Sequence, residues 1–219
     1  MKFENTEVWG FIHAIRGMRN PYDSWSKSDT NCLDGIGEKD LELAQKLIKA
    51  GSEHRKFLRQ IFVSVDITAP LYWWKEFDTY KVGTVSNSCS TMHTLIKKKI
   101  TLKSFEMDDY EDVLITQSKE YETYFAMHGI WHNIISSCEC LRKEYVKNKD
   151  KMIWKELIRL LPESYLQKRT ITMNYENLLS MVKQRKNHKL TEWSVKFVEW
   201  VKSLPYANEL IFGEENGKC

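Results

Sequence analysis

The chain has 219 residues, of which 42% are hydrophobic, and its formal net charge at pH 7 is +3. This length and composition suffice for one sizeable core, so we expect a single domain over residues 1–219. The small charge gives no argument for a nucleic-acid partner, because the lysines and arginines are spread along the chain rather than clustered.

Two further features bear on the cellular setting. No apolar stretch approaches the roughly 20 residues that span a bilayer, and the N-terminus MKFENTEVWG lacks the form of a signal peptide. We therefore expect a soluble cytoplasmic protein without membrane contact. The cysteines agree with a reducing cytosol, since they form an odd set without disulfide-scaffold spacing: Cys32, Cys89, Cys138, Cys140 and Cys219.

The first third of the chain predicts a strand, a loop, a helix and a second strand. Residues 6–16 are typical of a strand or strand-to-helix edge, and a turn-rich loop follows through Gly37. An amphipathic helix then ends at Gly51, with an apolar face of Leu41, Ala44, Leu47 and Ile48. Residues 57–67 predict a strand, because four apolar residues alternate with others: Ile61, Val63, Val65 and Ile67.

The stretch TAPLYWWKEFDTYKVGTVSNSCSTMH, residues 68–93, predicts a helix that delivers side chains to a polar loop. Pro70 suits the first turn of that helix, whose inward stripe would be Leu71, Trp74, Phe77 and Lys81. Lys81 would then overhang the loop from Val85 to His93, which is rich in serine, threonine and asparagine. Such a loop is either a binding site or a solvated connection, and spacing alone leaves both open.

The second half predicts mostly helices. A basic connection begins at Lys97, a long helical pattern runs over 107–149, and a further helix over 152–161 ends before Pro162. Metal binding is not predicted, because a Cys-x-Cys pair does not converge on a helix and the two nearby histidines lack the glutamate of a zincin motif. Buried thiols and a surface histidine pair are the ordinary interpretation of Cys138, Cys140, His128 and His132.

The last segment is the clearest helical pattern of the chain. Asn174 is suited to be an N-cap, and Arg185 shares one face with Leu178, Met181 and Val182. A guanidinium on an apolar face needs an anionic or multi-acceptor partner, such as a nucleotide phosphate or base carbonyl, or else an internal ion pair or exit to water. A second apolar stripe predicts core or an oligomer interface: Trp193, Phe197, Trp200, Val201 and Leu204.

Residues 62–93 resemble the flavin-dependent thymidylate synthases, the ThyX family. That family has a strand, an Ala-Pro pair, a helix ending in Arg-His-Arg, and a Ser/Asn/Glu/Ser/Arg/Tyr loop that receives dUMP. Ala69-Pro70 match, Lys75-Glu76 stand at the family's Arg-Gln, and Thr79-Tyr80-Lys81 replace Arg-His-Arg. After one inserted residue, Asn87 and Ser90 match, while Ser88, Met92 and His93 stand where the family has Glu, Arg and Tyr.

The resemblance continues at both ends, so that it covers most of the chain in outline. His54 falls without gaps on a histidine that contacts flavin in the family, although by its place alone, at a strand entrance, it would be a surface or structural residue. Downstream, the family's closing block carries a dUMP-binding arginine, and the matching positions are Leu161-Pro162, Thr172-Met173-Asn174, Leu178-Leu179 and Arg185.

The resemblance implies an α/β (α+β) fold with a central mixed or antiparallel sheet flanked by long helices, assembled as a homotetramer. It implies reductive methylation of dUMP or a related pyrimidine nucleotide, using FAD, NADPH and methylenetetrahydrofolate, without a side-chain nucleophile. The cofactor-binding residues would be His54, Lys81, Asn174 and Ser180. The substrate-binding residues would be Glu76, Asn87, Ser88, Ser90, His93 and Arg185.

Several positions depart from the family pattern, and four of the departures replace an arginine that would bind a ligand. Thr79 and Lys81 replace two arginines, Met92 replaces the loop arginine, and Glu176 stands where a flavin-contacting arginine is expected. Each lost charge-assisted contact is worth about 1.5–3 kcal/mol, and lysine does not reproduce the bidentate geometry of arginine. Two hypotheses follow: an enzyme of this family, which we favour, or a non-catalytic nucleotide-binding protein, a sensor or sequestrant, on the same fold.

Overall fold

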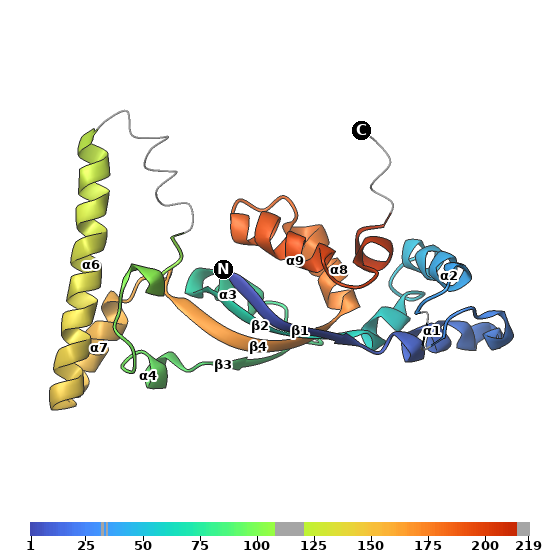
Figure 1. The fold of residues 1–219 in the computed structure, drawn as a ribbon, viewed down its shortest axis with the longest axis horizontal. Helices are drawn as coiled ribbons and strands as arrows, with labels where there is room; N and C mark the ends of the chain where they lie inside the picture. Colours follow the sequence, from blue (N-terminus) through green and yellow to red (C-terminus); the bar gives the residue numbers. More distant parts are fainter. Residues whose placement is uncertain (32, 34, 108–120, 214–219) are drawn as a thin grey trace. The chain divides into compact units, whose positions relative to one another are not determined.

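The computed structural model describes residues 1–31, 33, 35–107 and 121–213, and it combines one sheet with many helices (Figure 1). The sheet is four-stranded in the order β1-β2-β4-β3, with strands β1 (Lys2–Trp9), β2 (Phe62–Pro70), β3 (Val85–Ser88) and β4 (Leu166–Asn174). The helices are α1 (Phe11–Arg19), α2 (Glu38–Lys49), α3 (Leu71–Phe77), α4 (Thr91–Thr94), α6 (Tyr121–Asn148), α7 (Lys151–Leu160), α8 (Tyr175–Arg185) and α9 (Val198–Lys202). Short 3₁₀ turns cover Asn20–Tyr22, Trp25–Lys27, Lys56–Gln60 and Leu102–Ser104, and π-helical turns cover Glu192–Phe197 and Asn208–Phe212.

Strands β2 and β4 run antiparallel. The hydroxyls of Ser64 and Thr172 lie 2.6 Å apart, and the Thr170 hydroxyl donates to Asp66 over 2.6 Å. Residue numbers therefore rise along β2 as they fall along β4, which is the antiparallel relation. The predicted fold class, an antiparallel sheet flanked by helices, is confirmed.

The alternation predicted for β2 is also confirmed. Ile61, Val63, Val65 and Ile67 are buried, whereas Phe62 between them is exposed. The predicted start at residue 57 was wrong, because Lys56–Gln60 forms a 3₁₀ turn that buries Phe57 and Leu58 before the strand begins.

Contacts divide the described chain into two compact units. Unit 1 contains Met1 and residues 68–77, 88–107 and 121–169. Unit 2 contains residues 2–31, 33, 35–67, 78–87 and 170–213. Strands β2 and β4 each continue from one unit into the other. A single domain over the whole chain stays a prediction.

The core that the sequence predicts for the C-terminal helical segment lies in unit 2. Helices α8 and α9 lie on one face of the sheet (Figure 1), and α8 buries Leu178, Met181 and Val182. All five residues of the second apolar stripe, Trp193, Phe197, Trp200, Val201 and Leu204, are buried in this chain. The predicted stripe is therefore core.

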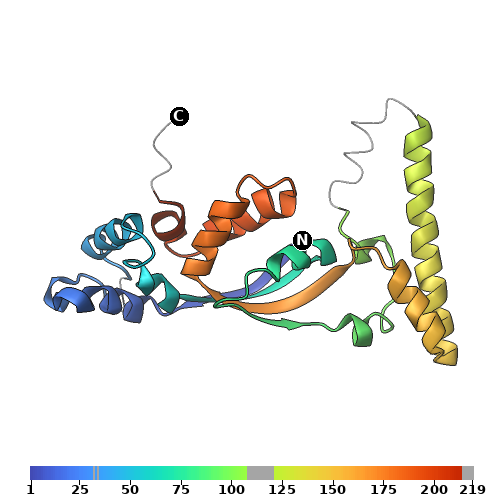
Figure 2. The same ribbon diagram turned by 180° about the vertical axis from the view of Figure 1, so that it is seen from behind.

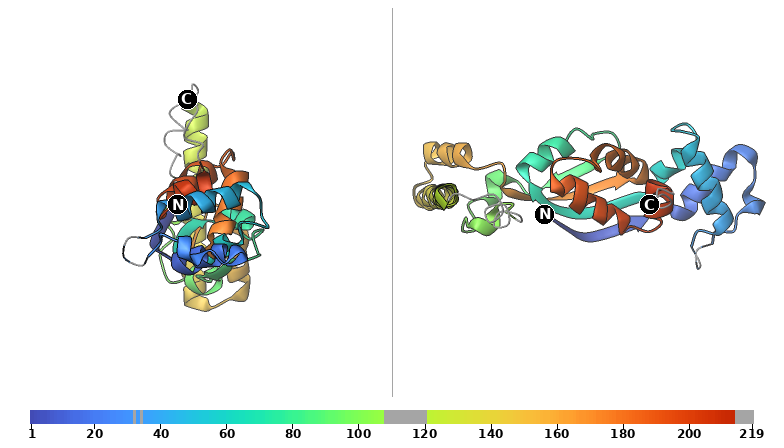
Figure 3. Two further views of the ribbon diagram at one scale, coloured as in Figure 1. Left: turned by 90° about the vertical axis from the view of Figure 1, so that its right-hand side faces the viewer. Right: turned by 90° about the horizontal axis from the view of Figure 1, so that it is seen from above.

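The N-terminal part of unit 2 agrees with two predictions. Of the two interpretations of residues 6–16, a strand or a strand-to-helix edge, the structure shows the second: β1 ends at Trp9 and α1 begins at Phe11, with Gly10 in a left-handed backbone conformation between them. Helix α2 ends at Lys49, two residues before Gly51, as the pattern predicts. Figure 3 shows α1 and α2 beside each other in the view from above.

Unit 1 is built around the packing of α6 against α7, which Figure 2 shows from behind. One core cluster of this unit consists of Leu95, Ile100, Phe105, Cys138 and Leu157. Helix α7 confirms the predicted helix over 152–161, and α6 confirms the later part of the long helical pattern. Residues 108–120 of that pattern, and also Cys32 and Cys219, lie outside the described residues.

An ion pair within α6 also binds the backbone of residues 96–100. The Glu139 carboxylate, 8% exposed as a residue, accepts from the Arg142 Nε and Nη2 over 2.7 Å each and from the Ile100 amide over 2.9 Å. Arg142 also donates to the Ile96 carbonyl over 3.0 Å. These bonds fix the loop of residues 96–100 to the helix.

Candidate functional site

The helix that was predicted to carry Lys81 is shorter than expected. Helix α3 begins directly after Pro70, which is the last residue of β2, and it ends at Phe77. Its buried residues are Trp73, Trp74 and Phe77. The prediction that Lys81 closes the inward stripe was therefore wrong, because the chain leaves the helix at Asp78.

The segment after α3 lies along helix α8 instead. The Asn177 side-chain amide donates to the Val82 carbonyl over 2.8 Å. Two helical turns further on, the Tyr80 hydroxyl donates to Gln184 Oε1 over 2.9 Å. Asn177 and Gln184 share one face of α8, so this face holds residues 80–83 in place and leaves Lys81 exposed above it.

Gly83 makes this close approach possible. Its φ is +77°, a left-handed conformation that favours glycine. A Cβ atom there would lie 2.9 Å from Asn177 Oδ1 and 3.1 Å from Asn174 Nδ2. The loop therefore reaches the start of α8 only with a residue that has no side chain.

Asn174 caps helix α8, as the sequence predicts. Its side-chain oxygen accepts from the Asn177 amide over 3.0 Å, and the Asn177 side chain accepts from the Asn174 amide over 3.2 Å. This reciprocal capping box satisfies two backbone donors. Asn174 is 8% exposed, so its first role is structural, and its part in flavin binding stays a prediction.

Glu176 is neutralised from within the chain. The carboxylate that replaces a family arginine accepts three hydrogen bonds from Arg55, from Nε over 2.9 and 3.1 Å and from Nη2 over 3.0 Å. Both side chains are about one-sixth exposed, at 15% and 16%. The pair adds no net charge to the start of α8.

Sequence reasoning missed the role of Arg55. Its partner is 121 residues away, so no local spacing reveals the pair. The available signal was chemical: a carboxylate at a position that normally carries an arginine needs a cation, and Arg55 adjoins the candidate His54.

Arg185 was expected on the inward face of its helix, in need of a partner. The structure places it partly buried at the last turn of α8, where its Nε donates to the Tyr80 hydroxyl over 2.8 Å. Its guanidinium also lies over the rings of Tyr80 and Trp193, 5.5 and 5.0 Å from their centroids. A hydroxyl and two aromatic faces hold the charge.

The expected loop from Val85 to His93 is mostly regular structure, so its prediction as a loop was wrong. Strand β3 takes Val85–Ser88 and the single turn α4 takes Thr91–Thr94. The reason is pairing with β4: the Cys89 amide donates to the Lys168 carbonyl over 2.8 Å, and Gln167 Nε2 donates to the Cys89 carbonyl over 3.1 Å.

The candidate residues divide between the two units. Glu76, Ser88, Ser90 and His93 belong to unit 1, where Glu76 lies on α3, Ser88 ends β3, and Ser90 and His93 begin and line α4. The residues of unit 2 are His54, Lys81, Asn87, Asn174, Ser180 and Arg185. Ser180 and Arg185 belong to α8, Asn174 is its N-cap, and Lys81 lies in the segment beside it, whereas Asn87 is exposed on β3.

The structure gives no sign of a metal centre. In residues 1–31, 33, 35–107 and 121–213, no three histidine, cysteine or acidic side chains group as metal ligands. His128 and His132 are exposed, as expected. Cys138 is buried as expected, but Cys140 is exposed, so the prediction of a buried thiol was wrong there. Across the same described ranges, no helix has the length and apolar character to cross a membrane.

The groups along α8 suit an anionic ligand with hydrogen-bonding edges. Lys81 is exposed, and within the described part of the chain its ammonium makes no hydrogen bond or ion pair. The charges of Arg55 and Glu176 cancel each other, and Asn177 and Ser180 are uncharged.

Tyr175, the first residue of α8, is a core residue. Burial raises the pKa of Tyr175, whose hydroxyl donates to the Pro205 carbonyl over 2.5 Å and so stays protonated in the core.

Comparison with known proteins finds the same fold in solved enzymes. The chain is similar to flavin-dependent thymidylate synthase ThyX from Helicobacter pylori complexed with FAD and dUMP, with 19% identity, 99% of each chain covered and a TM-score of 0.68. A second structure of this enzyme with FAD and dUMP gives the same identity and TM-score, over 99% of this chain and 98% of that one. No protein-family model matches the sequence, and a search of curated proteins finds no significant match.

Proposed function

We propose that this protein is an enzyme related to the flavin-dependent thymidylate synthases, which binds FAD and methylates dUMP or a related pyrimidine nucleotide. The observation that carries the proposal is the shared fold over 99% of this chain with structures that contain both FAD and dUMP. The gathering of four of the candidate residues along α8 supports it. The identity of 19% leaves the substrate to be determined by experiment.

The flavin would be held by His54, Lys81, Asn174 and Ser180. Bound flavin supplies hydride chemistry, which no protein side chain can provide. Of these four residues, Lys81 offers the charge: its exposed ammonium can approach a phosphate as a point charge, although without the planar fork of arginine. Ser180 is partly exposed on α8 and offers a hydroxyl as donor or acceptor.

The nucleotide would be held by Arg185 together with Glu76, Asn87, Ser88, Ser90 and His93. The Arg185 guanidinium is a suitable anion ligand because its planar donors match phosphate and carbonyl oxygens. Methylenetetrahydrofolate as carbon donor, NADPH as reductant, a homotetramer and a cytoplasmic location belong to the same proposal.

The test is the visible absorbance spectrum of the purified protein, followed by titration with FAD. The proposal expects a flavin band near one FAD per chain and, after reduction, flavin oxidation that requires dUMP and methylenetetrahydrofolate. A colourless protein that FAD does not saturate would contradict flavin use. If that protein still binds dUMP by calorimetry, the non-catalytic nucleotide-binding alternative replaces the enzyme.

Arg185 gives a residue-specific check. Arg185→Ala removes a charge-assisted contact and should weaken dUMP binding by about 10- to 100-fold. Calorimetric titration measures the change, and Lys183→Ala on the exposed side of the same helix is the control that should leave the affinity unchanged. Unchanged affinity in Arg185→Ala, with an unchanged melting curve, would remove Arg185 from the nucleotide site.

A further inference from the structure

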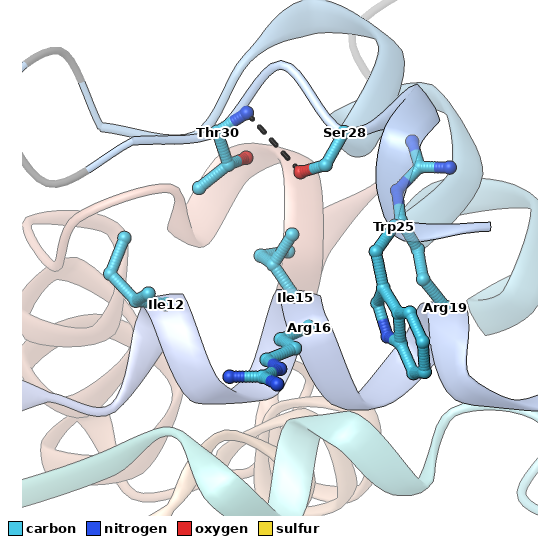
Figure 4. Close-up of a pocket in the computed structure, with 7 residues that line it drawn as sticks. All are labelled: Ile12, Ile15, Arg16, Arg19, Trp25, Ser28 and Thr30. Carbon is cyan, nitrogen blue, oxygen red and sulfur yellow. Dashed lines mark hydrogen bonds between the residues drawn. The ribbon is translucent and has the colours of Figure 1, made fainter. Parts of the chain in front are cut away.

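A pocket lies in unit 2, between helix α1 and the segment that follows it. Its volume is about 290 Å³. Helix α1 contributes Ile12, Ile15, Arg16 and Arg19, which at spacings of three, four and seven share one face of the helix. Ser28 and Thr30 lie across from this helix, and Trp25 lies beside its Arg19 end (Figure 4). No lining residue is among those assigned above to flavin or nucleotide.

The walls of this pocket are largely apolar and aromatic. Ile15 is buried at its base, whereas Ile12 and Trp25 remain 42% and 47% exposed. Trp25 is oriented by a hydrogen bond of 2.9 Å from its Nε1 to the Asn20 side chain. A large exposed indole held in place beside a hollow offers a planar surface on which a ring can stack.

The two arginines of the pocket differ in charge balance. Arg19 is 5% exposed, and its Nε donates to Asp40 over 2.5 Å, so this pair is neutral together. The same carboxylate accepts from the Ser28 hydroxyl over 2.6 Å. Arg16 is exposed, and none of the described residues forms a hydrogen bond or ion pair with its guanidinium. The pocket therefore carries one uncompensated positive charge.

We propose that this pocket binds a small aromatic monocarboxylate. The ring would lie against Trp25 and Ile12, and the carboxylate would pair with Arg16, whose planar donors match two oxygens. One net positive charge balances a carboxylate monoanion but only half of a phosphate dianion, so a carboxylate is the better match. The volume, at the lower end for ligand pockets, limits the ligand to one or two rings.

The experiment titrates the full-length protein with 2-naphthoate by calorimetry, in parallel with uncharged 2-naphthamide and with 2-naphthyl phosphate. We expect 2-naphthoate to bind more tightly than both. Arg16→Gln should weaken 2-naphthoate binding by about 10-fold or more and leave 2-naphthamide unaffected. Trp25→Leu should weaken both ligands, because stacking does not depend on charge.

The control is Arg59→Gln, an exposed arginine of unit 2 outside the pocket, which should bind 2-naphthoate like the original protein. Because Arg16 is exposed and unpaired in the described structure, its replacement should leave the melting curve unchanged. The proposal is overturned if 2-naphthoate does not bind at millimolar concentration, if Arg16→Gln binds it as well as Arg59→Gln does, or if 2-naphthyl phosphate binds more tightly.

Discussion

Asp40 is a charged residue in the interior of unit 2. Its buried carboxylate accepts hydrogen bonds from the Ser28 hydroxyl, the Asp29 and Thr30 amides and Arg19, and so ties the segment after α1 to helix α2. Burial by itself raises the pKa of Asp40, but the hydrogen bonds from Ser28, Thr30 and Arg19 outweigh it, so that the pKa lies below its ordinary value.

This pKa shift predicts acid sensitivity. Because the pKa of Asp40 is lower in the folded than in the unfolded state, its stabilisation is complete above the unfolded value, about pH 4, and is lost as pH falls through the folded value. Asp40→Asn should lower the free energy of unfolding at pH 7 by about 3–5 kcal/mol, since Arg19 loses its partner. The free energy of unfolding, measured with urea at a series of pH values, should also fall less steeply on acidification in this variant.

Asp23→Asn, at an exposed position, is the control for that series. It should change neither the free energy of unfolding at pH 7 nor the way that this free energy falls on acidification. If the free energy of unfolding of Asp40→Asn falls on acidification as steeply as that of the original protein, other carboxylates govern acid unfolding.

Single residues were predictable where their role is local. Asn174 was recognised as an N-cap because capping depends on a residue and its next three neighbours. Arg185 was recognised as an arginine in need of a partner, but its partner Tyr80 lies 105 residues away and was not predicted. Arg55 and Glu176 are 121 residues apart in the sequence, and no local sequence pattern indicates that two such distant residues form an ion pair.

Among the elements, the stretch from α3 to β3 departs most from its local pattern. The apolar spacing predicts a helix through Lys81, yet α3 ends at Phe77. Contacts of the following segment with α8, above all the bonds at Val82 and Tyr80, stabilise a path that helical propensity alone does not favour. Helix α7 was predicted nearly to both ends, as were the end of α2 and the N-cap of α8, because their apolar faces pack as their patterns require.

Gly83 should be the most sensitive point of that segment. Gly83→Ala places a Cβ against Asn174 and Asn177 at positive φ, so the free energy of unfolding should fall by about 1–2 kcal/mol or more. Urea unfolding measures it. Gly129→Ala is the matched control with the opposite sign, because a Cβ in α6 meets open space and should stabilise by about 0.5–1 kcal/mol. If Gly83→Ala leaves the free energy of unfolding unchanged, the loop can move away from α8 without destabilising the protein.

At the scale of the whole molecule, the fold was predictable in class and not in detail. The family resemblance rested on a few matched positions between His54 and Arg185, and the fold it implied is confirmed by solved structures that are 19% identical. The division of contacts into two units was not predicted. It follows from which residues share a core, and composition does not reveal that.

Cooperative unfolding tests the single domain. Because β2 and β4 each supply residues to both units, one transition is expected, and a variant in either unit should shift it. Glu139→Gln in unit 1 leaves Arg142 without its carboxylate, and Asp40→Asn in unit 2 does the same to Arg19. Each variant should unfold in a single transition with a lower urea midpoint. The midpoint measured by circular dichroism should equal the one measured by tryptophan fluorescence. Two separated midpoints in Glu139→Gln would establish two domains.

The hydrogen bond between Tyr80 and Arg185 gives the protein an internal competitor for any anion that would bind the Arg185 Nε. The phenol is tethered beside the guanidinium, so its effective concentration there is high and constant, whatever else is in solution. Tyr80 accepts from the Arg185 Nε, so an anion that needs this donor binds only in molecules where Tyr80 has released it, and its apparent affinity falls by that fraction. The Tyr80 hydroxyl therefore sets a threshold of affinity for any ligand that uses this donor.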